Sequence, residues 1–394
     1  MKIGFDLSQT GSRRAGCGFY ADTLMHHLVA QYPSDQFCLY KTFGNTYWDP
    51  DYRQRIPTSA VDNCQYFAVA RQRDDSFSFW GNPQGVDEVK IGLPDVVHAN
   101  NFSSPRLRQA RLIYTVYDLS FIDLPGCTTE ENRYLCFNGM FDASLWADIV
   151  VAISHYSRQR FLDNFPHFPA ERALVAHLGN RLAASGPETP VLPLSSEQPF
   201  FLAVGTLEPR KNLRRLLGAY QRYVTATPLP KPLVLAGGEG WLEGDLKTYI
   251  EALQIQPYIH VLGYVSDATL RWLYKHCWAF IYPSLYEGFG LPVLEAMAAG
   301  AATITSNVTS LPEVGGEAVY YVNPLDEASI AAALQWVEDD NQRQALQELC
   351  QRQAQQFSWE TTAKIVHQAY EQALALPSRR RSVQPSLRVQ EPAL

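Results

Sequence analysis

The stretch YPSLYEGFGLPVLEAMAAG, residues 282–300, has the pattern of a strand end, a glycine loop and a helix. Pro292 suits the first turn of a helix, and Gly300 stands where a helix commonly ends in a left-handed glycine. The start of such a helix presents unpaired backbone N–H groups, which suit an anion such as a diphosphate. Two carboxylates, Glu287 and Glu295, bracket this proposed anion site.

The same alternation of strands and helices runs through the rest of the chain. Short apolar runs separated by longer helical patterns are typical of buried parallel sheets. With 394 residues, of which 46% are hydrophobic and 19% charged, the chain has enough apolar material for two domains. The runs are residues 2–5, 96–97, 112–116, 149–153, 200–204, 233–236, 260–262 and 279–282. We therefore predict an α/β protein whose two domains face a cleft at the carboxyl ends of their strands.

A segment rich in proline, serine and alanine, without a helical period, interrupts this pattern at residues 183–199. It predicts a linker between an N-terminal domain, residues 1–182, and a C-terminal domain, residues 200–357. A helical pattern over residues 358–376 follows. Residues 377–394 have the composition of a disordered tail.

A second glycine turn opens the C-terminal domain in AVGTLEPRKNL, residues 203–213. A glycine after a strand, here Gly205 followed by Thr206, lets a phosphate approach the backbone. Arg210 and Lys211 offer positive charge to a departing diphosphate. The alternative is a basic start of a surface helix, which would oppose the helix dipole. We therefore favour an anion-binding turn.

Glu287 and Glu295, together with the residues around them, reproduce an E-x7-E motif. On this motif the chain resembles the retaining glycosyltransferases of family 4, which have the GT-B fold of two Rossmann-like domains facing an interdomain cleft. The resemblance implies an N-terminal domain for the acceptor and a C-terminal domain for a nucleotide sugar, with Glu287 on the donor sugar and Glu295 on the ribose. The implied diphosphate loop comprises Gly288, Phe289, Gly290 and Leu291. Two exposed glutamates on an amphipathic helix remain the alternative.

Three weaker segments also match this family. Val265, in residues 263–267, corresponds to a backbone contact with the base, although ordinary helix capping explains the segment equally well. Gly16 and Gly18, in residues 11–20, correspond to a glycine loop beside the phosphates and the acceptor, although any tight turn needs glycines. Residues 309–314 match a segment beneath the active site whose role can be only structural.

Two predicted strands of the N-terminal domain end in polar residues that we expect at the cleft. His98 is a candidate catalytic residue there, with a core histidine as the alternative. Asp118 is a candidate to orient or deprotonate an acceptor hydroxyl, with a helix cap as the alternative. The family normally has His-Asp at this second segment, whereas this chain has Tyr117 before Asp118.

The resemblance implies transfer of a hexose or deoxyhexose to a hydroxyl, with the departing diphosphate taking the proton. Residues 117–119 and 206–212 are most similar to bacterial mannosyltransferases of O-antigen, capsule or exopolysaccharide synthesis. GDP-mannose is therefore the expected donor, as a co-substrate and not a cofactor, and a glycan or lipid-linked glycan the expected acceptor. GT-B enzymes generally need no metal for the diphosphate, and we interpret the D-x-D at residues 49–51 as a turn.

Two other classes of protein remain open. A GT-B sugar-nucleotide epimerase shares the fold but lacks an E-x7-E of this form. A non-catalytic glycan-assembly protein could retain the fold, and Tyr117 is the one hint of it.

Net charge and cysteine content indicate which binding partners and which cellular compartment to expect. A net charge of −7 gives no sign of a nucleic-acid partner. Seven scattered cysteines without a C-x-x-C, and no leader pattern, indicate a cytoplasmic protein. Arginines 379–381 and Arg388 would allow peripheral contact with anionic lipid at the inner face of a membrane, although we favour a solvated tail.

Overall fold

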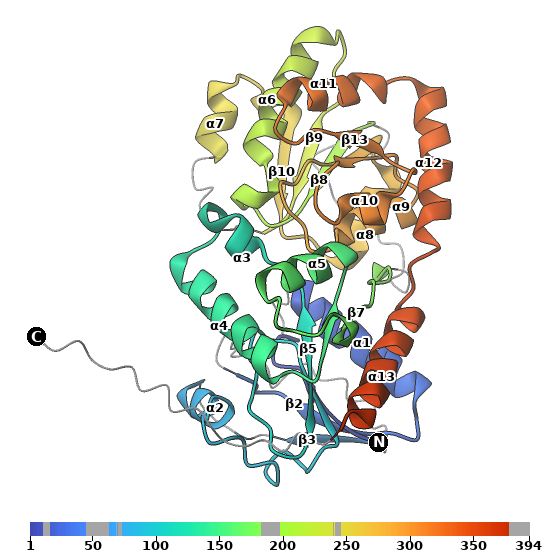
Figure 1. Cartoon of the computed structure of the whole chain (residues 1–394). Helices are drawn as coiled ribbons and strands as arrows, with labels where there is room; N and C mark the ends of the chain where they lie inside the picture. Colours follow the sequence, from blue (N-terminus) through green and yellow to red (C-terminus); the bar gives the residue numbers. More distant parts are fainter. Residues whose placement is uncertain are drawn as a thin grey trace, which may run out of the picture.

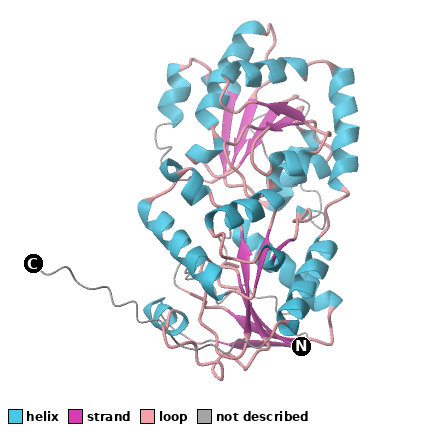
Figure 2. Ribbon diagram, in the orientation of Figure 1, coloured by secondary structure: helices cyan, strands magenta, loops and turns pink. Residues whose placement is uncertain are grey.

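The computed structural model describes residues 1–10, 16–44, 63–67, 69, 73–182, 198–238, 240 and 246–377. Within them, two parallel sheets flanked by helices form two α/β domains, so the predicted fold class is confirmed (Figures 1 and 2). Four predicted features lie wholly or largely outside the described residues. They are the loop before Gly16, the D-x-D turn, most of the linker and the tail.

The N-terminal sheet has seven strands in the order β3-β2-β1-β4-β5-β6-β7, all parallel. The strands are β1 (Lys2–Asp6), β2 (Gln36–Tyr40), β3 (Cys64–Phe67), β4 (Val96–Ala99), β5 (Arg111–Val116), β6 (Ile149–Ala152) and β7 (Ala173–Val175). The helices are α1 (Gly16–Gln31), α2 (Arg73–Trp80), α3 (Ser120–Asp123), α4 (Glu130–Trp146) and α5 (His155–Asn164). Every apolar run predicted in this half lies in or overlaps a strand.

The C-terminal sheet has six parallel strands in the order β10-β9-β8-β11-β12-β13. They are β8 (Phe201–Val204), β9 (Leu233–Ala236), β10 (Ile259–Gly263), β11 (Ala279–Tyr282), β12 (Thr303–Ser306) and β13 (Tyr320–Val322). The helices are α6 (Leu213–Ala226), α7 (Leu246–Ala252), α8 (Asp267–His276), α9 (Leu291–Ala298), α10 (Leu311–Gly315), α11 (Glu327–Trp336) and α12 (Asp340–Ala354). The strand order reverses beside β8 and β11, and this is where a doubly wound sheet binds its ligand.

Helix α13 (Trp359–Ala375) leaves the C-terminal domain and lies against the N-terminal one (Figure 1). It contacts α1 and strands β4, β5 and β6. Its inner face is fully buried through Val366, Ala369 and Tyr370. The chain therefore passes between the domains twice among the described elements, once before β8 and once between α12 and α13.

The two domains touch at the carboxyl ends of their sheets. A Cβ placed on Gly288, after β11, would lie 2.3 Å from the carbonyl oxygen of Tyr117, after β5. Ser157 Oγ lies 2.9 Å from that oxygen and 3.2 Å from the carbonyl oxygen of Gly288. The cleft is therefore closed at this point.

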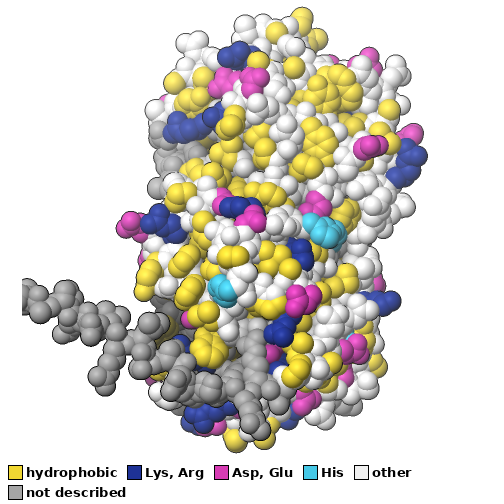
Figure 3. Space-filling view, in the orientation of Figure 1, with side chains coloured by type: hydrophobic (Ala, Val, Ile, Leu, Met, Phe, Trp, Pro, Cys, Tyr) yellow, Lys and Arg dark blue, Asp and Glu magenta, His cyan; other side chains and the backbone are white. Residues whose placement is uncertain are grey.

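The surface shows no segregation of charge on the face drawn in Figure 3. Basic and acidic side chains of the described residues are interspersed there among hydrophobic ones. Across the described residues, no helix is both long enough and apolar enough to cross a membrane. The seven cysteines are free thiols.

Candidate functional site

Glu287 and the two predicted cations form a buried cluster behind the glycine loop that follows β11. Glu287 Oε1 accepts a hydrogen bond from Lys211 Nζ at 2.7 Å, and Oε2 accepts one from Arg210 Nη1 at 2.9 Å. Tyr282 Oη and Ser284 Oγ also donate to Oε1, at 2.8 and 2.6 Å. The fold thus brings together residues 76 and 77 positions apart in the sequence.

The charges of this cluster are balanced. Burial alone would raise the pKa of Glu287, but Arg210 and Lys211 outweigh it and lower the pKa to about 2. Arg210 Nη2 also donates to the buried Glu208 Oε1 at 2.7 Å, so that two carboxylates face two cations. Any anion that bound these cations would have to replace one of the two carboxylates.

The backbone around the cations is fixed by one asparagine. Both cations lie in the 3-10 turn Pro209–Lys211, which ends at Asn212 with a left-handed φ of 61°. Asn212 Nδ2 donates to the carbonyl oxygens of Pro283 and Pro324, at 2.9 and 2.7 Å. Asparagine tolerates this conformation better than most residues. The turn is thereby joined to the carboxyl end of β11.

Gly205 and Thr206 follow β8 beside Lys211. Gly205 has a φ of 143°, and a Cβ there would lie 3.3 Å from Lys211 Cε. A Cβ on Gly237, after β9, would lie 1.9 Å from the carbonyl oxygen of Gly205. Thr206 is half-buried in the same turn. The close approach of these two backbones explains why glycines are needed here.

Glu295 lies on α9 and is 3% exposed. Its Oε1 lies 2.6 Å from Arg181 Nε, in an ion pair that lacks the alignment of a hydrogen bond. Tyr274 Oη donates to Oε2 at 3.3 Å. Burial raises the pKa of Glu295 to about 7, although Arg181 opposes the shift. The guanidinium of Arg181 also covers the ring of Phe19, at 3.9 Å from its centroid.

The start of α9 is open to a ligand through its backbone. Gly290, with a φ of 104°, precedes the helix and provides no side-chain cap, and Leu291 is the first helical residue. Pro292 and Gly300 stand at the two ends of α9 as predicted, Gly300 with a φ of 84°. The ring of Phe289 is 2% exposed, so this residue can contact a donor only through its backbone.

Asp118 lies next to this loop and has a structural partner. The Cβ position of Gly288 is 2.9 Å from Asp118 Cβ. Asp118 Oδ1 accepts from the backbone N–H and the hydroxyl of Ser120, at 2.9 and 2.7 Å. Asp118 therefore fixes the start of α3 with one oxygen and also lies where the domains meet.

Tyr117, which replaces the family's histidine, points into an aromatic group. Its ring centroid is 5.4 Å from that of Tyr20 and 5.7 Å from that of Phe102. The side chain is 7% exposed, and its hydroxyl has no hydrogen-bond partner in the described part of the chain.

The structure contradicts the prediction that His98 faces the cleft. His98 is fully buried, with Nδ1 2.7 Å from Tyr370 Oη and Nε2 2.8 Å from Thr115 Oγ1. It is the third residue of β4, and the alternation of side chains places it on the face that α13 covers. Burial lowers its pKa to about 3. His98 is therefore a neutral core residue.

The remaining predicted contact residues are Gly16, Gly18 and Val265. Gly16 is the first residue of α1 and is exposed, and the buried Gly18 lies next to Phe19, which Arg181 covers. The start of α1 is thereby joined to Glu295. Val265 is half-buried between β10 and α8, whose N-cap is Ser266.

The segment 309–314 holds the glycine loop and reaches the other domain. Thr309 Oγ1 accepts from the backbone N–H of Glu287 at 3.1 Å, and Ser310 Oγ donates to the carbonyl oxygen of Glu287 at 2.8 Å. Glu313 accepts from the backbone N–H groups of His155 and Tyr156, at 2.7 and 3.3 Å. A carboxylate of one domain thus caps helix α5 of the other.

Three side chains of this site were not predicted from the sequence. Glu208 stands two positions before Arg210, and an acid so close to a cation was an available signal. Arg181 follows β7, so its position after a strand was a weaker signal. No sequence signal marked Ser157, because the two carbonyl oxygens that it contacts come from different domains.

Comparison with known proteins gives consistent results. Residues 188–357 match the family described as glycosyl transferases group 1. The chain is 36% identical over 286 residues to O-antigen chain mannosyltransferase B of Escherichia coli. The aligned region covers 70% of this chain and 74% of that protein. It is 32% identical over 243 residues to the serotype-specific mannosyltransferase WbdA of Escherichia coli, over 58% of this chain and 29% of WbdA.

Solved structures show the same fold. Sucrose-phosphate synthase from Thermosynechococcus elongatus superposes with a TM-score of 0.73 at 19% identity, over 95% of this chain and 99% of that one. HepE of Anabaena, in complex with UDP-glucose, superposes with a TM-score of 0.69 at 18% identity, over 94% and 100% of the two chains.

Proposed function

Because the chain belongs to the group 1 glycosyl transferases, we propose that it is a retaining mannosyltransferase that moves mannose from GDP-mannose to a hydroxyl of a glycan or lipid-linked glycan. Its similarity to the two Escherichia coli mannosyltransferases supports mannose as the sugar. The same relatives support O-antigen or a related polysaccharide as the product. No cofactor takes part in the proposed reaction.

The single observation that carries the proposal is the buried cluster of Glu287, Arg210 and Lys211 beside the open start of α9. A diphosphate bound there would take hydrogen bonds from the helix start and charge from the two cations. Glu287, released from the cations, would contact the sugar. Glu295 Oε1, which has no aligned donor, would accept a hydrogen bond from a ribose hydroxyl.

The proposed reaction needs no protein nucleophile. The acceptor oxygen attacks the anomeric carbon on the face that the diphosphate leaves, so the new C–O bond forms as the bond to the diphosphate breaks. The acceptor proton passes to an oxygen of the departing diphosphate. Asp118 would orient the acceptor hydroxyl, and closure at Gly288 would exclude water, which would otherwise hydrolyse the donor.

A hollow in the N-terminal domain supports a lipid-linked acceptor. It has a volume of about 580 Å³ and lies between α3 and α4, three residues beyond Asp118. Its lining is mainly apolar: Phe121, Ile122, Pro125, Glu130, Arg133, Tyr134 and Phe137. Tyr134 and Phe137 are 69% and 43% exposed. An acceptor with a hydrocarbon chain could cover these rings while its sugar reaches Asp118.

Calorimetric titration with GDP, UDP, ADP and dTDP in the presence of a chelator tests the donor. We expect GDP to bind in the micromolar range and the others to bind more weakly. The anomeric configuration of the product made from GDP-mannose, read by NMR, then tests retention. Tighter binding of UDP would overturn the choice of donor, and no binding of any nucleotide would favour the non-catalytic alternative. Release of free sugar without an acceptor would favour the epimerase.

A further inference from the structure

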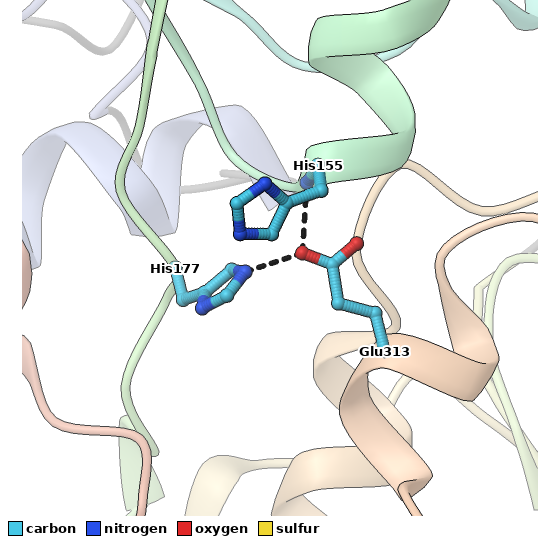
Figure 4. Close-up of side chains that lie close together, drawn as sticks. All are labelled: His155, His177 and Glu313. Atoms are coloured by element: carbon cyan, nitrogen blue, oxygen red, sulfur yellow. Dashed lines mark hydrogen bonds and ion pairs between the residues drawn. The ribbon is translucent and has the colours of Figure 1, made fainter.

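His155, His177 and Glu313 converge at the domain interface (Figure 4). His155 begins α5 and His177 follows β7, both in the N-terminal domain, whereas Glu313 lies on α10 of the C-terminal domain. One nitrogen of each imidazole and one carboxylate oxygen all lie within 4.8 Å of one another.

Two of the three side chains are held in place before any ligand binds. The oxygens of Glu313 accept from the backbone N–H groups at the start of α5, and Oε1 also contacts His177 Nε2. The ring of His177 packs against those of Phe289 and Phe357, with centroids 5.9 and 5.7 Å away. His155 is exposed, so its ring can turn, and an ion can reach the group from solvent.

We propose that His155, His177 and Glu313 bind one divalent transition-metal ion, of which zinc is the representative, and that this ion bridges the two domains. Imidazole nitrogens with one carboxylate suit zinc, whereas calcium and magnesium prefer oxygen ligands. Tetrahedral zinc with bonds of about 2.1 Å separates its ligand atoms by about 3.4 Å. The present contact between His177 Nε2 and Glu313 Oε1 is shorter than that spacing, so metal binding moves these two atoms apart as well as turning the ring of His155.

Metal binding here replaces the hydrogen bond between His177 and Glu313. When Nε2 of His177 binds the ion through its lone pair, a neutral ring carries its one proton on Nδ1, and a doubly protonated ring releases the Nε2 proton to solvent. The fourth position of the tetrahedron stays open to water. The backbone N–H groups that hold Glu313 become its outer partners. Because the ligands come from both domains, the ion favours the closed arrangement.

Calorimetry of the full chain with zinc chloride, after treatment with a chelator and its removal, tests the site. We expect one zinc per chain in the wild-type protein, binding weakened at least tenfold in His155→Ala, and similar weakening in Glu313→Gln. His276→Ala, which removes an exposed histidine on α8, should bind zinc as the wild type does. Thermal unfolding gives a second measure: zinc should raise Tm in the wild type and His276→Ala but not in His155→Ala.

Equal zinc binding by the wild type and His155→Ala would overturn the proposal, because free cysteines such as Cys17 and Cys127 would then be the ligands. Absence of zinc binding by the folded wild-type protein would overturn it as well. Neither outcome bears on the nucleotide site, which the titrations in chelator test separately.

Discussion

Lys211 is the residue whose environment is most specialised for binding an anion. Its ammonium group is buried, and burial and the neighbouring Arg210 lower its pKa. It donates to Glu287 Oε1 and, at 2.6 Å, to Tyr282 Oη. A buried cation that exchanges one anionic partner for another can stabilise charge that develops on a leaving group.

Lys211→Ala should lower kcat about 100-fold, the scale expected for one lost contact to a developing oxyanion. Steady-state kinetics with GDP-mannose would measure it. Lys247→Ala, on the exposed side of α7, is the matched control and should leave kcat unchanged. An unchanged kcat in Lys211→Ala would remove Lys211 from the mechanism.

Glu295→Ala should weaken nucleotide binding by about tenfold or more, because a charged acceptor for the ribose is lost. Calorimetry with GDP measures the change. Glu251→Ala, an exposed glutamate on α7, serves as the control. Wild-type affinity in Glu295→Ala would mean that the ribose binds elsewhere.

His98 makes the stability of the fold depend on pH in a defined direction. Its pKa falls from 6.5 to about 3 on burial, so the unfolded chain binds a proton that the folded chain excludes. The contribution of neutral His98 to the free energy of unfolding is complete above pH 6.5. As the pH falls from 6.5 toward 3, the free energy of unfolding decreases by about 1.4 kcal/mol per pH unit because of this residue. Urea unfolding from pH 6.5 to 4 should show a shallower dependence in His98→Gln, whereas His167→Gln, at an exposed histidine, should match the wild type. Equal slopes in wild type and His98→Gln would contradict the assignment.

At the scale of elements, the loop between β11 and α9 is in contact both with the segment of Thr309 and Ser310 and with the other domain. Its Glu287 is fixed by Thr309 and Ser310, and its Gly288 touches Tyr117 of the other domain. The segment of Thr309 and Ser310 also carries Glu313 to α5. A displacement of this loop would therefore also displace residues at the domain interface.

Gly288→Ala should separate binding from catalysis. The added methyl would lie 2.3 Å from the carbonyl oxygen of Tyr117, so the domains could not close fully. We expect near-normal GDP binding with a kcat reduced about 100-fold, the cost of a displacement of about 1 Å at a reacting centre. Gly126→Ala meets no atom within 4 Å and should behave as the wild type. Normal turnover in Gly288→Ala would show that this contact is not needed.

Elements defined by local signals could be predicted, and contacts that depend on two domains could not. Pro292 and Gly300 mark helix ends through the chemistry of a few neighbouring residues, and both stand where predicted. The contact of Glu313 with α5 spans 158 positions, and no periodicity encodes it. The prediction that His98 faces the cleft was wrong because of a small error in a strand boundary. The strand was predicted to end before His98, whereas the residue lies within the strand.

At the scale of the whole molecule, α13 makes the N-terminal domain from two distant parts of the chain. Tyr370 is fully buried and its hydroxyl lies 2.7 Å from His98 Nδ1, 272 positions away. Thr362, also on α13, donates a hydrogen bond from Oγ1 to the carbonyl oxygen of His177, which follows β7. The terminal helix is therefore part of this domain's core.

Tyr370→Phe should lower the free energy of unfolding by about 1–3 kcal/mol, because a buried ring nitrogen of His98 loses its partner. Denaturant unfolding at constant pH measures the loss. Tyr134→Phe, at a tyrosine that is 69% exposed, is the matched control and should change stability little. Equal stability of Tyr370→Phe and wild type would mean that α13 is not integral to the N-terminal domain.

The return of α13 also has a consequence during synthesis on the ribosome. Strands β4, β5 and β6 are translated early, but the helix that covers one of their faces follows more than 200 residues later. At about 5–20 residues per second this interval is about 10–40 s. Throughout it, α13 cannot cover Val96, Ile113 and Val151, which belong to the same core cluster, and uncovered apolar surface of this kind is what makes an incomplete chain prone to aggregate.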